Sequence, residues 1–171
     1  MEKKFNITGT CIPNRHYMVD TSNKIQKIMK LINAEEYFII NRPRQYGKTT
    51  TFFLLNNKLE KSEDYLPISI SFEGVGDLIF ENEKIFSSEF LQILADDVMF
   101  SNSDLAVFLE SQKNSVDNFR DLSKALTKFI LKSNKKVVLL IDEVDKSSNN
   151  QLFLSFLGML RNKYLLRNQG R

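Results

Sequence analysis

The chain has 171 residues, 42% of them hydrophobic, which is enough for one domain with a core. A formal net charge of +3 is too small to indicate nucleic-acid binding by itself, and 26% of charged residues is ordinary for a soluble protein. The one cysteine, Cys11, excludes an intrachain disulfide, and no stretch reaches the roughly 18 apolar residues of a membrane span, so we expect a cytoplasmic protein without membrane partners.

The first part of the chain predicts an irregular segment, a helix and a strand. Residues 1–20 show no regular pattern. Thr21 or Ser22 can cap a helix, because apolar residues then recur on one face at Ile25, Ile28, Met29 and Ile32. The continuous apolar run Tyr37–Ile40 predicts a central strand buried on both faces.

The rest of the chain alternates strand and helix patterns. Such alternation predicts an α/β domain with a mainly parallel sheet, covering residues 1–171. Right-handed crossovers would then place the loops after the first and third strands at one edge. The further elements are a strand at Leu66–Phe72, a turn at Glu73–Asp77, helices at 84–99 and 105–109, a helix begun by Ser115 or Asp117, a third strand at Val137–Ile141 and a last helix capped by Asn149 or Asn150.

A glycine-lysine-threonine sequence follows the first predicted strand and opens a helix that runs to about Leu59. This layout is typical of a phosphate-binding P-loop, G-x-x-x-x-G-K-[ST], with Arg42 at the first glycine position. Pro43 could set the turn there by fixing φ. Lys48 would reach the β- and γ-phosphates, and the Thr49 hydroxyl would bind magnesium. The residues whose backbone N–H groups would hold the phosphates are Arg44, Gln45, Tyr46, Gly47, Lys48, Thr49 and Thr50.

An acidic pair follows the third predicted strand. Asp142 ends five aliphatic residues, where a carboxylate is costly unless it faces a cation or a polar cleft, so we expect it to hold magnesium. Glu143 would orient or deprotonate an attacking water. The simpler alternatives are a helix start with a solvated lysine and a solvated acidic turn. Asp145 and Lys146 are better explained as an ion pair or cap.

Other charged residues leave alternatives open. Arg42 and Arg44 could add charge beside the phosphates or point to solvent. Arg161 or Arg167 could reach the nucleotide of a neighbouring subunit in a homo-oligomer, although an exposed helix face explains them as well. His16 has no histidine or cysteine partners for zinc.

Several blocks, in order along the chain, resemble the AAA-like ATPase domains of bacteria, within the P-loop NTPase class. They are Tyr17–Asp20, Asn41–Thr50, Ile70–Gly74 and Leu140–Lys146. That family's loop usually reads Arg-Pro-Arg-Arg/Gln-Phe/Tyr-Gly-Lys-Ser/Thr, so the arginine at position 42 is normal for it. The resemblance implies a three-layer αβα sandwich in which Lys48, Thr49, Asp142 and Glu143 serve ATP and magnesium. Members often carry a PD-(D/E)xK nuclease-like region downstream, of which these residues show nothing.

The resemblance also implies the strand order 5-1-4-3-2, in which a fourth strand carrying a polar sensor residue separates the first from the third. No such strand follows the last predicted helix, so we expect a domain truncated before the sensor strand. Its sheet would either contain a groove or close differently. Hydrolysis by residues 1–171 alone is expected to be weak or absent, even where nucleotide binds.

Three functions compete. The first is an ATP-binding and ATP-hydrolysing domain that couples nucleotide state to a downstream effector or to DNA. The second is a signalling-type switch that binds ATP with little turnover, and Glu143 favours hydrolysis over it. The third is a DNA- or protein-binding module with a relic nucleotide site, against which the intact Lys48, Thr49 and Asp142 argue. No guanine-reading motif points to GTP.

Overall fold

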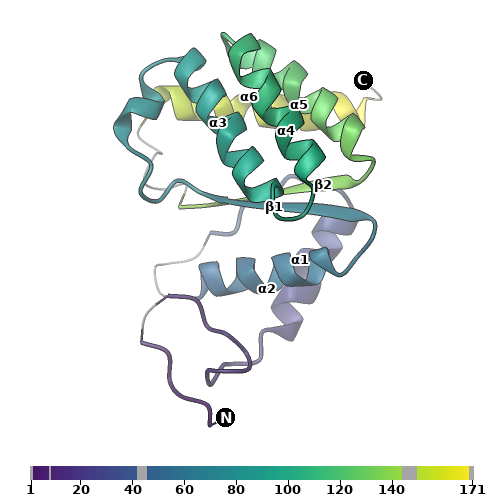
Figure 1. Cartoon of the computed structure of the whole chain (residues 1–171). Helices are drawn as coiled ribbons and strands as arrows, with labels where there is room; N and C mark the ends of the chain where they lie inside the picture. The colour runs from purple at the N-terminus through teal and green to yellow at the C-terminus, as the bar shows by residue number, and fades with distance from the viewer. Residues whose placement is uncertain (1, 8, 42–45, 144–149, 170–171) are drawn as a thin grey trace. The chain divides into compact units, whose positions relative to one another are not determined.

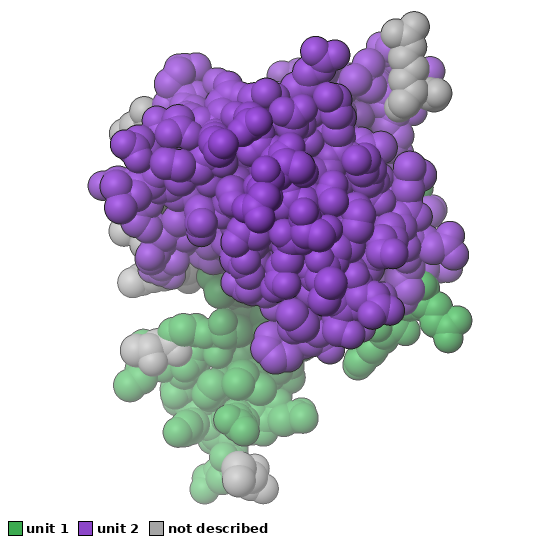
Figure 2. Space-filling view, turned by 45° about the horizontal axis from the view of Figure 1, so that its top comes forward, with its two compact units in different colours: residues 1–63 green, residues 64–171 purple. Residues whose placement is uncertain are grey.

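The computed structural model describes residues 2–7, 9–41, 46–143 and 150–169 (Figure 1). The chain divides into two compact units, residues 1–63 and residues 64–171, which Figure 2 colours separately. The expectation of one domain over the whole chain stays a prediction.

The first unit is built on two helices, α1 (Ser22–Asn33) and α2 (Lys48–Glu60). The predicted apolar face of α1 is confirmed, since Ile25, Ile28 and Ile32 are all buried, and α1 contacts α2. Thr21 is the N-cap residue, but its side chain makes no capping hydrogen bond. The carboxylate of Asp20 accepts the Ser22 N–H instead, at 2.8 Å.

The segment Tyr37–Ile40 is not a strand, so the prediction of a buried central strand is wrong. The Ile39 side chain is 81% exposed, and the segment does not belong to the sheet. The backbone N–H and C=O groups of a strand find their hydrogen-bond partners on neighbouring strands. A short apolar run cannot supply these partners by itself. Because this segment does not belong to the described sheet, the expected groove in the sheet, or its different closure, beside the segment stays a prediction.

The second unit contains a two-stranded parallel sheet formed by β1 (Tyr65–Ser71) and β2 (Lys136–Asp142). The register runs from Tyr65 opposite Lys136 to Ser71 opposite Asp142. Side chains alternate between faces along a strand, and β1 accordingly buries Leu66, Ile68 and Ile70. Both strands were predicted, and so was their parallel pairing.

Four helices lie on one side of this sheet (Figure 1). The α/β class with a parallel sheet is therefore confirmed, whereas the second unit by itself has two layers and not the expected three. The helices are α3 (Glu83–Val98), α4 (Ser103–Gln112), α5 (Phe119–Ser133) and α6 (Gln151–Asn168), with short 3₁₀ turns at Asp77–Phe80 and Lys113–Ser115.

Asparagine residues cap these four helices. The side chains of Asn82, Asn102, Asn118 and Asn150 each accept a backbone N–H from the first turn that follows, which satisfies a donor that the helix cannot. Asn150 was a predicted cap. Helix α5 begins after Asn118 and not after Ser115 or Asp117.

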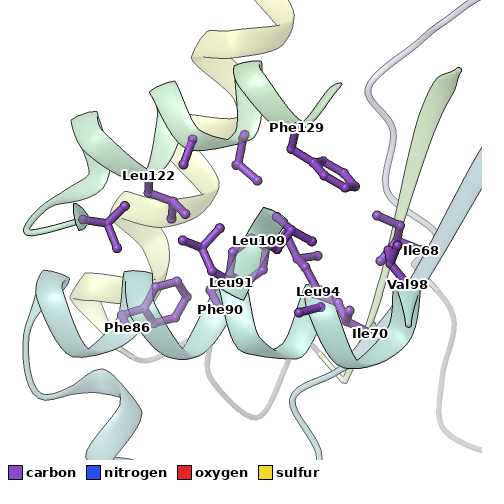
Figure 3. Close-up of a cluster of buried hydrophobic side chains, with 14 of the residues drawn as sticks. Ile68, Ile70, Phe86, Phe90, Leu91, Leu94, Val98, Leu109, Leu122 and Phe129 are labelled. Atoms are coloured by element: carbon purple, nitrogen blue, oxygen red, sulfur yellow. The ribbon is translucent and has the colours of Figure 1, made fainter. Parts of the chain in front are cut away.

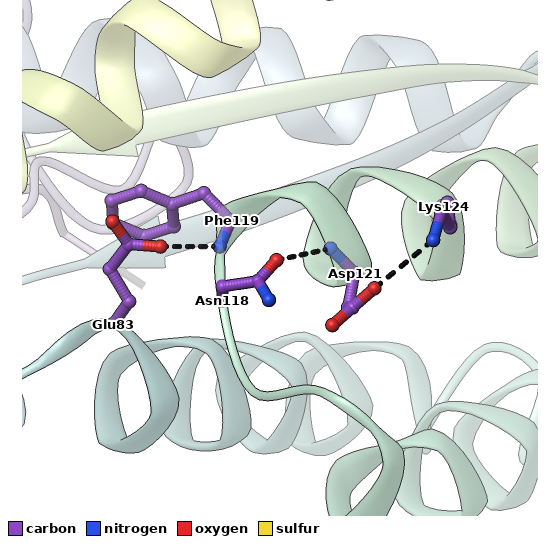
Figure 4. Close-up of polar contacts among 5 residues, drawn as sticks. All are labelled: Glu83, Asn118, Phe119, Asp121 and Lys124. Atoms are coloured by element: carbon purple, nitrogen blue, oxygen red, sulfur yellow. Dashed lines mark hydrogen bonds and ion pairs between the residues drawn. The ribbon is translucent and has the colours of Figure 1, made fainter.

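The start of α5 is held from two directions (Figure 4). The Asn118 side chain accepts the Asp121 N–H at 3.1 Å, and Glu83 of α3 accepts the Phe119 N–H at 2.8 Å. Lys124 pairs with Asp121 at 3.2 Å. This pair and the Lys84–Asp117 pair are largely exposed, so their contribution to stability is small. The Glu83 contact fixes α5 against α3.

Buried aromatic and aliphatic side chains fill the space between the sheet and the helices (Figure 3). Phe86 is the centre of the aromatic part, and it has no exposed surface. Its ring centroid lies 4.8 Å from that of Phe156, 5.7 Å from that of Phe119 and 6.0 Å from that of Phe90. Burial of these rings is the main favourable term for the unit, because they remove the most apolar area from water.

Lys163 of α6 connects that helix to α5. Its Nζ lies 2.5 Å from Thr127 Oγ1 and 2.9 Å from the Ser123 carbonyl oxygen. Burial lowers the pKa of Lys163 from its ordinary value of 10.5, because a partly desolvated ammonium is disfavoured.

The lowered pKa predicts an alkaline pH dependence of stability. Between the lowered value and 10.5 the unfolded chain binds more protons at this position than the folded protein, so the free energy of unfolding should rise with pH there. In Lys163→Met this contribution disappears, and the rise should be shallower than in the wild type. Urea unfolding of both proteins between pH 8 and pH 10.5 measures how the free energy of unfolding changes with pH. Parallel curves for the two proteins would contradict the assignment.

Within the described residues, no helix combines the length and the apolar character needed to cross a membrane.

Candidate functional site

Helix α2 begins at the residues that the P-loop pattern singles out. Gly47 precedes Lys48 and has φ 71°, a left-handed conformation that glycine adopts without the steric cost a β-carbon would bring. The first turn contains no acidic residue. Helix geometry turns the N–H groups of this turn outward, toward the positive end of the helix dipole, which favours an anion. The predicted helix start is therefore confirmed.

The side chains around this helix start differ in exposure. Tyr46 and Thr49 are exposed, whereas Lys48 and Thr50 are half-buried. Arg42, Pro43, Arg44 and Gln45, which include two of the expected phosphate-binding residues, lie outside the described residues. Asp145 and Lys146 also lie outside them.

Two polar contacts tie the first turn of α2 to distant parts of its unit. The Cys11 backbone N–H donates to Thr50 Oγ1 at 3.1 Å. Lys24 Nζ donates to Thr51 Oγ1 at 2.7 Å, and that hydroxyl donates to the Gly47 carbonyl oxygen, also at 2.7 Å. Thr51 is only 1% exposed. Sequence reasoning missed Lys24, Thr51 and the Cys11 contact, because residues 27 and 39 positions apart give no pairing signal in a single sequence.

A hollow of about 490 Å³ lies in the first unit between α1 and residues 38–41. Its lining includes apolar Ile28 and Phe38 together with the charged residues Asp20, Lys24 and Lys27. Lys24 therefore lines this hollow and also reaches the first turn of α2.

Asp142 and Glu143 lie at the carboxyl end of β2, as predicted. Asp142 is the last residue of the strand, stands opposite Ser71 and is half-buried. Its Oδ1 accepts the Glu143 N–H at 2.9 Å. Glu143 has φ 56°, which costs about 1–2 kcal/mol for a residue with a β-carbon. Strained backbone of this kind concentrates at functional sites, so the conformation marks Glu143 as a candidate.

The helix start belongs to the first unit and the acidic pair to the second. The structure thus brings Lys48 together with Thr49 in one unit, and Asp142 together with Glu143 in the other. In the part of the chain that the structure describes, no three histidine, cysteine or acidic residues gather into a metal cluster. Thr49 carries a hydroxyl in the first unit and Asp142 a carboxylate in the second, and each is a type of oxygen ligand that magnesium accepts.

The remaining candidate residues are two arginines of α6 and the single histidine. Arg161 and Arg167 are on α6 and exposed. His16 accepts the Ile12 N–H on its Nδ1 at 2.9 Å, which holds the turn between residues 12 and 16.

No protein-family model, no curated protein and no solved structure matched the chain.

Proposed function

We propose that the chain is an ATP-binding P-loop domain that hydrolyses ATP with magnesium in the full-length protein and so couples nucleotide state to a downstream effector. The observation that carries this proposal is the start of α2. A left-handed Gly47 leads directly into Lys48 and Thr49, in a first turn that contains no acidic side chain.

The acidic pair at the end of β2 supports the same function independently. A P-loop enzyme needs a carboxylate for magnesium and a base for water, and Asp142 and Glu143 are adjacent residues at the end of a parallel strand. Ligand sites in α/β proteins lie at such carboxyl ends.

Each residue has a distinct part in the proposed chemistry. The first-turn N–H groups of α2 bind phosphate oxygens, and the Lys48 ammonium neutralises charge between the β- and γ-phosphates. Thr49 Oγ1 and the Asp142 carboxylate would hold magnesium, which would supply charge stabilisation at the phosphates. Glu143 accepts the proton of the attacking water.

Magnesium and ATP together should raise the melting temperature of the protein. At a ligand concentration about 100 times the dissociation constant, binding adds about 2.7 kcal/mol of stability. For a protein of this size the melting temperature then rises by about 5–10 °C. Differential scanning fluorimetry with ATP, GTP and no nucleotide measures the shift and the preference for adenine. The relic-site alternative predicts no shift with either nucleotide.

A matched pair of lysine variants tests the site itself. Lys48→Ala should abolish the shift, because it removes the charge at the phosphates. Lys58→Ala is the control, since Lys58 is exposed in the last turn of the same helix, about 15 Å away along its axis. Equal loss in both variants would mean that general positive charge, and not the P-loop, binds the nucleotide.

A further inference from the structure

A chain of two hydrogen bonds runs from α1 to the residue that begins the P-loop helix. Lys24 Nζ donates to Thr51 Oγ1, and Thr51 Oγ1 donates to the Gly47 carbonyl oxygen, both at 2.7 Å. The Thr51 backbone N–H also donates to that oxygen, at 2.9 Å. Because Thr51 is almost completely buried, water does not compete strongly with these bonds.

We propose that Lys24 and Thr51 are positioning residues that orient the Lys48 N–H for phosphate binding; this role rests on the proposed function. The Gly47 carbonyl and the Lys48 N–H belong to one planar trans peptide unit, and the two groups therefore point in opposite directions. When two donors hold the Gly47 oxygen toward the body of α2, the Lys48 N–H must point outward from the helix start.

The conformation of Gly47 makes this constraint necessary. With φ 71° and no β-carbon, Gly47 can rotate into several other regions of backbone space at little cost. A peptide unit that rotated would turn the Lys48 N–H away from a bound phosphate. Two hydrogen bonds on the Gly47 oxygen remove that freedom before the ligand arrives, which improves affinity by lowering the ordering cost of binding.

Lys24 distinguishes this arrangement from an ordinary helical threonine. A threonine hydroxyl often donates to the carbonyl four residues earlier, and this contact alone is local. Here a charged donor from another helix, 27 residues away, binds the same hydroxyl oxygen. A cation on the oxygen polarises the O–H group and strengthens its bond to Gly47. The position of α1 is thereby connected to the orientation of the phosphate-binding peptide.

The test compares three substitutions by calorimetric titration with magnesium and ATP. Thr51→Val keeps the shape and removes the hydroxyl, Thr51→Ser keeps the hydroxyl, and Lys24→Met removes the charge. Thr51→Val and Lys24→Met should each weaken affinity about tenfold, the effect of losing one charge-assisted hydrogen bond. Thr51→Ser should bind as tightly as the wild type.

The second unit offers a matched control. Thr127 Oγ1 on α5 donates to the Ser123 carbonyl oxygen at 3.0 Å and accepts from Lys163, which is the same lysine–threonine–carbonyl arrangement on another helix. Thr127→Val should leave the affinity for magnesium and ATP unchanged. If Thr127→Val and Thr51→Val weaken binding equally, or if Thr51→Val binds like the wild type, the positioning role is overturned.

A measurement without nucleotide separates this inference from the proposed function. In a ¹H–¹⁵N spectrum of the unliganded protein, the Lys48 amide resonance should move in Thr51→Val and Lys24→Met and keep its place in Thr51→Ser. An unchanged resonance in all three variants overturns the inference. If the resonance moves as expected but the wild type binds no ATP, the hydrogen-bond chain orients the peptide and the proposed function fails.

Discussion

Replacement of Phe86 by alanine should lower the free energy of unfolding by about 3–5 kcal/mol. Phe86 has no exposed surface and packs its ring against those of Phe156, Phe119 and Phe90. The substitution removes buried apolar area and also leaves a cavity, because neighbours that belong to three helices cannot all move inward. Since most domains are stable by about 5–15 kcal/mol, this loss is a large part of the total.

The matched control is Phe100→Ala. Phe100 follows α3 and is 96% exposed, so its removal should change stability by no more than about 0.5 kcal/mol. Urea denaturation followed by circular dichroism measures both variants, and a shift of the midpoint at constant slope isolates the change in stability. Equal midpoints for Phe86→Ala and Phe100→Ala would mean that the ring cluster around Phe86 is not the core of the second unit.

The helices and the sheet of the second unit could be predicted, because the apolar residues that mark these elements in the sequence pack against one another within the same unit. The apolar residues of α5 recur at helical spacing, and Phe119, Leu122, Leu126 and Phe129 are buried, whereas Ile130 of the same pattern is 41% exposed. Both strands were found from short apolar runs, and their parallel pairing follows from the helices between them. In each case the apolar residues that form the sequence pattern also bury most of one another's side chains in the folded unit.

The Tyr37–Ile40 segment shows where such reasoning fails. Its apolar run has the composition of a buried strand, yet Ile39 is 81% exposed. An apolar run indicates that its side chains favour burial. It does not show which other segments of the chain would cover them. In the second unit β1 and β2 pair with each other through backbone hydrogen bonds. No comparable pairing exists for residues 37–40 among the described strands, and composition cannot reveal this.

The residues of the candidate site also fall into those that the sequence predicts and those that it does not. Positions fixed by local geometry were predicted: the glycine before α2 and the acidic pair at the end of β2 follow from where one helix begins and one strand ends. Positions fixed by tertiary contact were missed. Lys24 reads in the sequence as one of several helical lysines, and only the fold shows its Nζ 2.7 Å from Thr51 Oγ1. The left-handed backbone of Glu143 was equally invisible, because glutamate does not indicate positive φ.

Replacement of Glu143 by glutamine should slow ATP hydrolysis by the full-length protein about 10²–10⁴-fold while nucleotide binding persists. Glutamine keeps the size and the hydrogen-bonding reach of the side chain but cannot accept the proton of the attacking water. The left-handed backbone should be retained, because the Glu143 N–H bond to Asp142 Oδ1 does not involve the substituted group. The expected loss is therefore in the chemical step and not in the folding of the loop.

Single-turnover phosphate release measures that chemical step, and the thermal shift with magnesium and ATP shows that the variant still binds. Glu110→Gln is a suitable control, since Glu110 is an exposed carboxylate on α4, and it should release phosphate at the wild-type rate. A switch with little turnover predicts slow release from the wild type as well, with no further loss in Glu143→Gln. Equal and rapid release from both proteins would instead remove Glu143 as the base. Hydrolysis would then depend on water oriented by another group, and the strain at Glu143 would need a different explanation.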